Sequence, residues 1–214
     1  MRRFMIGALA SLAVALVALA ADHPVTFFAE DDSDGAHGVY RWDVKIDMET
    51  PPDVIADDHK VKPSTIGDWP APKGKITSKT PRSGREKEWF EVTGQVVLMK
   101  AEDDGDLHIQ IADADNADSV QVVVEIPVRQ FTSESPWTDI RREAFSWTDV
   151  TFPLTFSGSK NFTLNKKPVI RVEGKAFFDA THRKKDMPNR RANTDKEVAV
   201  WEIHPVMRLE IVQP

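Results

Sequence analysis

The residues best suited to chemistry are histidines and carboxylates that stand together in two separate stretches of the chain. The first stretch, EDDGDLHIQIAD, spans residues 102–113, and the second spans residues 172–206. Neutral imidazole and carboxylate oxygens are the ligands that zinc and similar divalent metals take in proteins. The candidate functional residues of the two stretches are Asp104, Asp106, His108, Asp179, His182, Glu202 and His204.

Two interpretations of these residues stay open at the level of sequence. In the first, the three histidines and Asp179 bind one divalent metal ion, which requires the fold to bring scattered positions together. In the second, Asp104 and Asp106 shape a turn. His182 and His204 then cap backbone groups or bond to Asp179.

A basic run begins at the first histidine of the second stretch. Residues 182–197 carry six Lys or Arg against three acids, a formal charge of +3, whereas residues 101–106 carry four acids and a formal charge of −4. A basic loop beside a barrel can grip an anionic ligand such as nucleic acid, phosphate or an acidic glycan. Alternatively, it pairs with the acidic segment or is simply solvated. The candidate anion-binding residues are Arg183, Lys184, Lys185, Arg190 and Arg191.

The elements that must position these residues have mainly β-strand patterns. Residues 107–112 alternate strictly, so His108 faces away from the apolar side. In the last strand, Glu202 and His204 share one face because they differ by two positions. The expected strands are residues 89–100, 107–112, 120–126, 169–178 and 198–212, with a short helix over residues 139–144.

Three strands, a helical or irregular crossover and two further strands are the element order of an OB-type barrel. The sequence therefore predicts a mainly β fold with a small five-stranded OB-like barrel. In that architecture the loops at residues 101–106 and 179–197 rise at the same end, which would bring the candidate residues to one functional pole. Gly94 and Gly174 are expected where barrel strands bend. Pro205 predicts an edge position or a bulge.

The first twenty residues have the features of a secretory signal peptide. Arg2 and Arg3 precede an apolar run over residues 4–19, and the tripeptide at residues 18–20 has the small-x-small pattern of a cleavage site. Cleavage after Ala20 would give an exported protein, periplasmic or secreted. No later segment is apolar enough to span a bilayer.

Composition then divides the mature chain into two parts. Residues 21–85 are charged and punctuated by proline, which predicts an extended arm with a single strand over residues 39–47. Residues 86–214 hold the dense β-patterns and form the expected OB-like domain.

Charge and composition exclude several classes of protein. The formal charge is −6, and removal of residues 1–20 with their two arginines lowers it to −8 over 194 residues. A negative chain opposes general binding to nucleic-acid backbones. The absence of cysteine excludes disulfides and thiolate catalysis. No P-loop, G-x-G-x-x-G, G-x-S-x-G or H-E-x-x-H motif occurs, so the residues suggest no cofactor other than a divalent metal.

The stretches DGDLHIQIAD, VVVEIP, GKAFFDATH and WEIHPV resemble a group of uncharacterised exported bacterial proteins with the motifs DGDxH, FFDxxH and WEIHPV. The lead-in KPSTIGDWPAP at residues 62–72 is similar to the same group. The resemblance covers roughly residues 60–212 and implies an exported OB-like domain without an established activity. Relatives have a short stretch after the first histidine, where this chain has the longer basic sequence RKKDMPNRRANTDKE.

Together these observations predict an exported binding module of OB-like fold. Its ligand would be a small molecule, a glycan or a nucleic acid, and the basic loop suits an anionic one. The alternative is a metal-dependent hydrolase, a nuclease for example, that uses a His/Asp cluster at the rim of the barrel. The sequence does not decide whether the protein is an enzyme.

Overall fold

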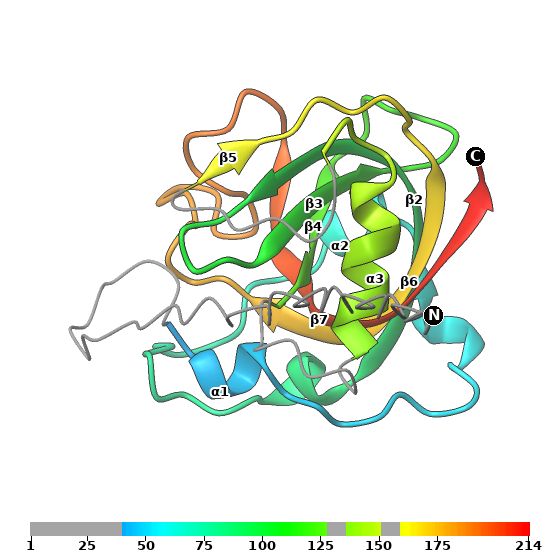
Figure 1. Cartoon of the computed structure of the whole chain (residues 1–214). Helices are drawn as coiled ribbons and strands as arrows, with labels where there is room; N and C mark the ends of the chain where they lie inside the picture. Colours follow the sequence, from blue (N-terminus) through cyan, green and yellow to red (C-terminus); the bar gives the residue numbers. More distant parts are fainter. Residues whose placement is uncertain (1–39, 128–135, 151–158) are drawn as a thin grey trace, which may run out of the picture.

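The computed structural model describes residues 40–127, 136–150 and 159–214, and its main feature is a closed barrel of five strands (Figure 1). Its strands are β2 (Trp89–Ala101), β3 (Leu107–Ala112), β4 (Gln121–Ile126), β6 (Val169–Phe178) and β7 (Val198–Gln213). The first three form an antiparallel meander, and β7 lies parallel to β4. Strand β6 pairs antiparallel with both β7 and β2, which closes the ring. This is the order of an OB-type barrel, so the predicted fold class is confirmed.

Short elements surround the barrel. Strand β1 (Lys60–Val61) runs parallel to β2, and β5 (Lys160–Asn161) pairs antiparallel with β2. Helix α3 (Pro136–Phe145) occupies the expected crossover between β4 and β6, and Trp137 Nε1 donates a 2.9 Å hydrogen bond to the Val206 carbonyl of β7. Within the described ranges, no helix has the length and apolar character needed to cross a membrane. The other helical segments are α1 (Trp42–Lys45), α2 (Pro63–Gly67) and the 3-10 helices η1 (Asp57–His59) and η2 (Gly84–Lys87).

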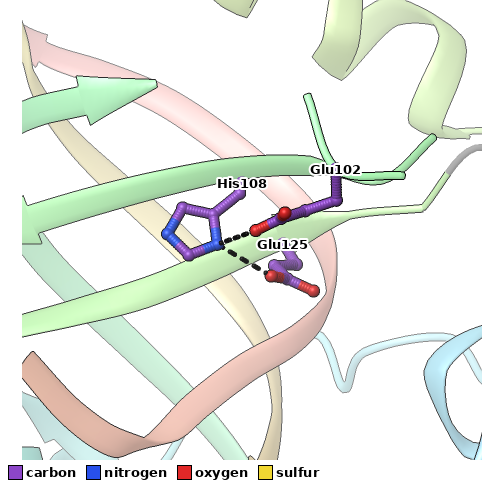
Figure 2. Close-up of side chains that lie close together, drawn as sticks. All are labelled: Glu102, His108 and Glu125. Atoms are coloured by element: carbon purple, nitrogen blue, oxygen red, sulfur yellow. Dashed lines mark hydrogen bonds and ion pairs between the residues drawn. The ribbon is translucent and has the colours of Figure 1, made fainter. Parts of the chain in front are cut away.

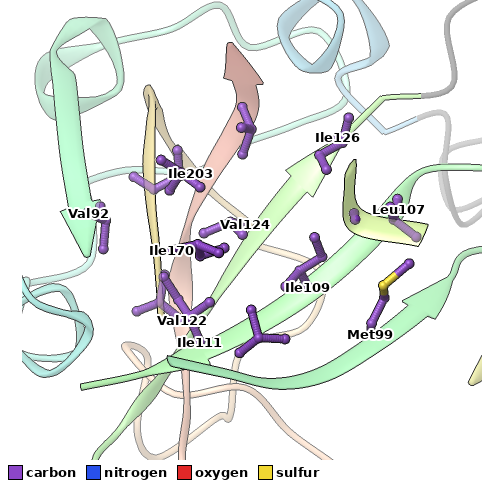
Figure 3. Packing of buried hydrophobic residues seen from close by; sticks show 14 of the residues in the cluster. Val92, Met99, Leu107, Ile109, Ile111, Val122, Val124, Ile126, Ile170 and Ile203 are labelled. Atoms are coloured by element: carbon purple, nitrogen blue, oxygen red, sulfur yellow. The ribbon is translucent and has the colours of Figure 1, made fainter. Parts of the chain in front are cut away.

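The apolar faces of the strands fill the barrel (Figure 3). Leu107, Ile109 and Ile111 of β3 are fully buried, as their alternation predicted, and so are Val122 and Val124 of β4. Each buried side chain of this kind stabilises the fold by about 1.5–3 kcal/mol. This interior is therefore the main source of stability for a chain without disulfides.

The two strand glycines are required by close packing between strands. A Cβ at Gly174 would lie 2.4 Å from the Pro205 carbonyl oxygen, and a Cβ at Gly94 would lie 2.5 Å from that of Ala112. The pairing of β6 with β7 shifts register on both sides of Gly174, whose partner is Val206, and Pro205 lies in the irregular stretch between Ile203 and Val206. The predicted bulge at this proline is thus confirmed.

The segment before the barrel departs from the prediction at its start. The strand expected over residues 39–47 is wrong, because residues 42–45 form the short helix α1. The alternation of these residues suits a strand, but no strand of the sheet pairs with them in the described part of the chain. Instead, Arg41 adopts a left-handed conformation, and its buried Nη1 lies 2.6 Å from Oε1 of Glu86.

The proline-rich segment up to residue 85 has little regular structure, as expected, but its described part packs against the barrel. Ile66 of α2 is fully buried, and Trp69 stacks near Phe90 of β2 with ring centroids 4.7 Å apart. The composition boundary at residue 85 is therefore not a boundary in packing. The predicted signal peptide and residues 21–39 lie outside the described residues.

Arg82 ties this segment to two barrel strands. Its guanidinium donates to the carbonyl oxygens of Val44, Ala176 and His204 at 2.7–2.8 Å. Burial lowers the pKa of Arg82 to about 10, so the group stays protonated at neutral pH. One cation thus holds α1, β6 and β7 together.

Candidate metal centre

Polar side chains from three neighbouring strands gather on the outer face of the barrel, opposite the apolar interior. Strand β3 contributes His108, β4 contributes Glu125, and β7 contributes Glu202 and His204. The register places His108 directly opposite Glu125, and β7 lies on the other side of β4. All four side chains are buried, so this face is a second buried layer of the protein. The buried polar layer, as the term is used below, comprises Asp106, His108, Glu125, Asp179, Arg191, Glu202 and His204.

Glu125 lies at the centre of this layer, between two histidines. Its Oε1 is 3.0 Å from Nδ1 of His108, and its Oε2 is 2.9 Å from Nδ1 of His204. Figure 2 shows that the same His108 nitrogen also faces Glu102, whose Oε1 is 3.0 Å away. On the far side of the ring, Gln110 Nε2 lies 3.0 Å from His108 Nε2, a contact that fixes the ring orientation.

His204 has carboxylates beside both ring nitrogens. Its Nδ1 faces Glu125, and its Nε2 lies 3.5 Å from Oδ2 of Asp106. Among the described residues, neither nitrogen makes a hydrogen bond of normal geometry. Two ligands of one ion have similar separations, because metal bonds of about 2.0–2.2 Å at tetrahedral or octahedral angles place the ligand atoms roughly 2.8–3.6 Å apart. A fully buried imidazole in this setting is suited to bind an ion.

Two groups of three residues in the described part of the chain have the spacing of a metal site. The first is Asp106, Glu125 and His204, all buried, and the second is Glu102, His108 and Glu125. In each group, one ligand atom per residue lies within 4.8 Å of the others. Glu125 belongs to both.

Asp104 and Asp106 have different roles. Asp104 shapes the turn, since its Oδ1 accepts a 3.1 Å hydrogen bond from the backbone of Asp106. Asp106 is fully buried beside Lys45, whose Nζ is 3.8 Å from Oδ2 of Asp106. Burial and the charge of Asp104 raise the pKa of Asp106 to about 7, despite the opposing effect of Lys45. The same two carboxylates raise the pKa of Lys45, although burial acts in the other direction.

The glutamates differ in charge state. Burial alone would raise the pKa of Glu125, but the neighbouring imidazoles of His108 and His204 outweigh it and hold that pKa well below the ordinary range. Burial also opposes ionisation of Glu102, yet contacts with His108 and Lys100 lower its pKa to about 2. Burial and the negative charge of Glu125 raise the pKa of Glu202 well above its ordinary value. Glu102 and Glu125 are therefore ionised at neutral pH and available as ligands.

Asp179 and His182 lie apart from this centre, on the other side of a buried arginine. Arg191 Nη2 contacts Oδ2 of Asp179 and lies 2.6 Å from Oε1 of Glu202. His182 Nδ1 contacts the same Asp179 carboxylate, and the His182 side chain is 47% exposed. The hydrogen bond to Asp179 raises the pKa of His182. The described residues do not bring the three histidines and Asp179 together as one metal-binding group, and Arg191 pairs with both Asp179 and Glu202. His182 bonds to Asp179, as the structural alternative predicted.

Two of the predicted anion-binding residues in the basic loop are buried and make contacts inside the protein. Arg190 and Arg191 are each only 8% exposed. Arg190 donates to the Gly67 carbonyl of α2, and Arg191 pairs within the polar layer. Arg183 and Lys185 are exposed and Lys184 is half-buried.

Glu125 and Glu102 are the functional candidates that the sequence did not reveal. A signal for Glu125 existed: it is the single charge in the apolar strand QVVVEI, and pairing across the meander places it opposite His108. Glu102 had only its place in a run of acids. No sequence pattern brings Lys45 to Asp104, at 3.1 Å, because 59 residues separate the two.

Comparison with known proteins gives no name to this site. No protein-family model matches the chain, and no match is found among curated proteins or solved structures.

Proposed function

We propose that this protein is an exported binding module whose OB-like barrel holds a divalent transition-metal ion between Asp106, Glu125 and His204. The observation that carries the proposal is the fully buried ring of His204, whose nitrogens face carboxylates without a hydrogen bond of normal geometry. A histidine that binds an ion through one ring nitrogen donates a hydrogen bond from the other. The carboxylate beside that second nitrogen of His204 can accept the hydrogen bond through one oxygen and bind the ion through the other. Export rests on the leader pattern of residues 1–20.

The charges of the layer support a bound cation. Asp106 and Glu125 are buried on either side of His204, with Lys45 beside Asp106 as a cationic side chain within ion-pair distance. A buried carboxylate costs several kcal/mol unless it is paired, so a further positive charge in the layer is stabilising. The mixed nitrogen and oxygen ligands suit zinc, manganese or iron(II) better than calcium or magnesium, which favour oxygen ligands alone.

The burial of the candidate metal ligands favours a metal-binding role over a catalytic one. A catalytic metal keeps an open coordination position that the substrate reaches. Asp106, His108 and His204 are fully buried, which gives a polymer such as nucleic acid no direct approach to them. The metal-dependent hydrolase therefore ranks second. An anionic ligand for the exposed part of the basic loop, Arg183 and Lys185, stays a prediction.

Metal analysis tests the proposal. The purified protein is stripped with a chelator, supplied with Zn²⁺ or Mn²⁺, desalted and assayed for metal by mass spectrometry, with Ca²⁺ as a comparison. At a free metal concentration 100 times the Kd, binding adds about 2.7 kcal/mol to the stability. For a chain of this size the melting temperature should rise by roughly 5–10 °C.

A histidine pair provides the matched control. His204→Gln should abolish retention at this position, whereas His182→Gln, which changes a half-exposed histidine beyond Arg191, should leave it unchanged. Failure of the wild-type protein to retain any transition metal, together with an unchanged melting temperature, would rule out the proposed function.

A further inference from the structure

We infer that the layer binds a second divalent ion, held by Glu102, His108 and Glu125, so that Glu125 bridges a dinuclear metal centre. This inference rests on the proposed function, since it adds a position beside the one that His204 helps to form. It assigns one carboxylate oxygen of Glu125 to each ion, and it explains why two histidines flank one glutamate.

Glu125 is oriented so that each of its carboxylate oxygens faces a different histidine. Its two oxygens face different histidines, Oε1 toward His108 at 3.0 Å and Oε2 toward His204 at 2.9 Å. A carboxylate that bridges two metal ions presents one oxygen to each, and the ions of such centres lie about 3.5–4 Å apart. The backbone supports this arrangement, because Glu125 projects from the strand that lies between those of the two histidines.

The second position has three candidate ligands grouped around Nδ1 of His108. His108 Nδ1 is 3.0 Å from one oxygen of Glu102 and 3.0 Å from one oxygen of Glu125. The contact of Gln110 Nε2 with the other ring nitrogen orients the ring so that Nδ1 is directed at the two carboxylates. Each position then has one imidazole, one carboxylate of its own and one oxygen of the shared Glu125. Figure 2 shows the residues of the second position.

Access distinguishes the two positions. The Glu102 side chain is 26% exposed, whereas those of Asp106 and His204 are fully buried. Lys100 Nζ lies 2.8 Å from the Glu102 oxygen that faces His108, and its own side chain is 26% exposed. The ammonium group of Lys100 can turn toward solvent when a metal ion binds the Glu102 oxygen that it now contacts. The second position should therefore load and unload faster than the first.

Metal stoichiometry tests the inference. The chelator-stripped wild-type protein is titrated with Zn²⁺, desalted and assayed for metal per chain, and the expected value is two. Glu102→Gln, at a partly exposed position, should fold and retain one ion. Asp103→Asn is the matched control, because this exposed neighbour in the same turn belongs to neither group and should leave the count at two. Circular dichroism of each metal-free variant checks that it is folded.

A second readout reports the bridge itself. Two Mn²⁺ ions joined by one carboxylate are spin-coupled, and the wild-type protein loaded with Mn²⁺ should show a coupled paramagnetic resonance spectrum that Glu102→Gln converts to that of an isolated ion. A wild-type count of one, or a count of two that Glu102→Gln does not lower, would overturn the second position and leave the proposed function intact. A count of zero would overturn both.

Discussion

The inner and outer faces of β3, β4 and β7 are both buried, but they are stabilised in different ways. On the inner face, Ile109 and its apolar neighbours fill the barrel and need no partner of a particular charge. On the outer face, His108, Glu125 and Glu202 are as deeply buried, and each depends on a specific charged neighbour. Burial on the outer face therefore depends on a balance of charges, whereas burial on the inner face depends on filling the available volume. Substitutions that change charge or volume separately can therefore tell the two faces apart.

The largest expected effect comes from removing the buried cation. Arg191→Met leaves the carboxylates of Asp179 and Glu202 buried without their shared partner, and should cost about 3–5 kcal/mol of unfolding free energy. Urea denaturation with chelator present measures it. Arg183→Met, at an exposed arginine of the same loop, should change the stability by less than about 0.5 kcal/mol. Equal effects of the two substitutions would show that the outer face does not depend on charge balance.

The next effect depends on pH. His182 and Arg191 outweigh burial and hold the pKa of Asp179 far below its usual value. The folded protein therefore keeps Asp179 ionised at pH values where the unfolded chain takes up a proton, near pH 4 and below. Its contribution to stability is complete above that range and is lost as the pH falls through it.

Asp179→Asn should accordingly destabilise the protein by about 3 kcal/mol between pH 5 and 8, and by progressively less below pH 4. Denaturation curves of the wild type and the variant at several pH values, with chelator present, give this difference directly. Asp186→Asn, at an exposed aspartate of the same loop, should show no such profile. A difference that grows as the pH falls would contradict the assigned charge state.

The smallest effect belongs to the inner face. Ile109→Val removes one buried methyl group and should cost about 0.5–1.5 kcal/mol. Because no charge is involved, the cost should be the same at pH 5 and pH 8, and the same with or without bound metal. A cost that varies with pH or metal would mean that the two faces are energetically coupled.

Sequence reasoning predicted the inner face well and the outer face in part. The strands over residues 107–112 and 169–178 have the bounds that the sequence predicted, and residues 107–112 alternate because one side of that strand faces an apolar interior. The same alternation placed His108, Glu202 and His204 on the opposite side. It could not show that this side is also buried, since polar residues on a strand usually indicate solvent.

The errors have a common physical origin in contacts between distant parts of the chain. The alternating residues 39–47 predicted a strand, yet no barrel strand pairs with the described ones, and residues 42–45 form α1 instead. Arg191 looked like part of a solvated basic run, but its guanidinium reaches Glu202 of β7. Glu125 is absent from the predicted site residues because its partners come from two other strands, β3 and β7. Each outcome depends on strand register and loop path, which local pattern does not encode.

The hydrogen bonds of Arg82 limit how this barrel can be transferred into another protein. Its guanidinium donates to carbonyls of α1, β6 and β7, so part of the barrel wall is supplied by a residue that precedes the first barrel strand. A graft that starts at residue 86 would take the ring of strands and leave behind the residue that joins two of them from outside. The smallest transferable unit therefore begins no later than α1, although composition alone would place the cut some forty residues further along the chain.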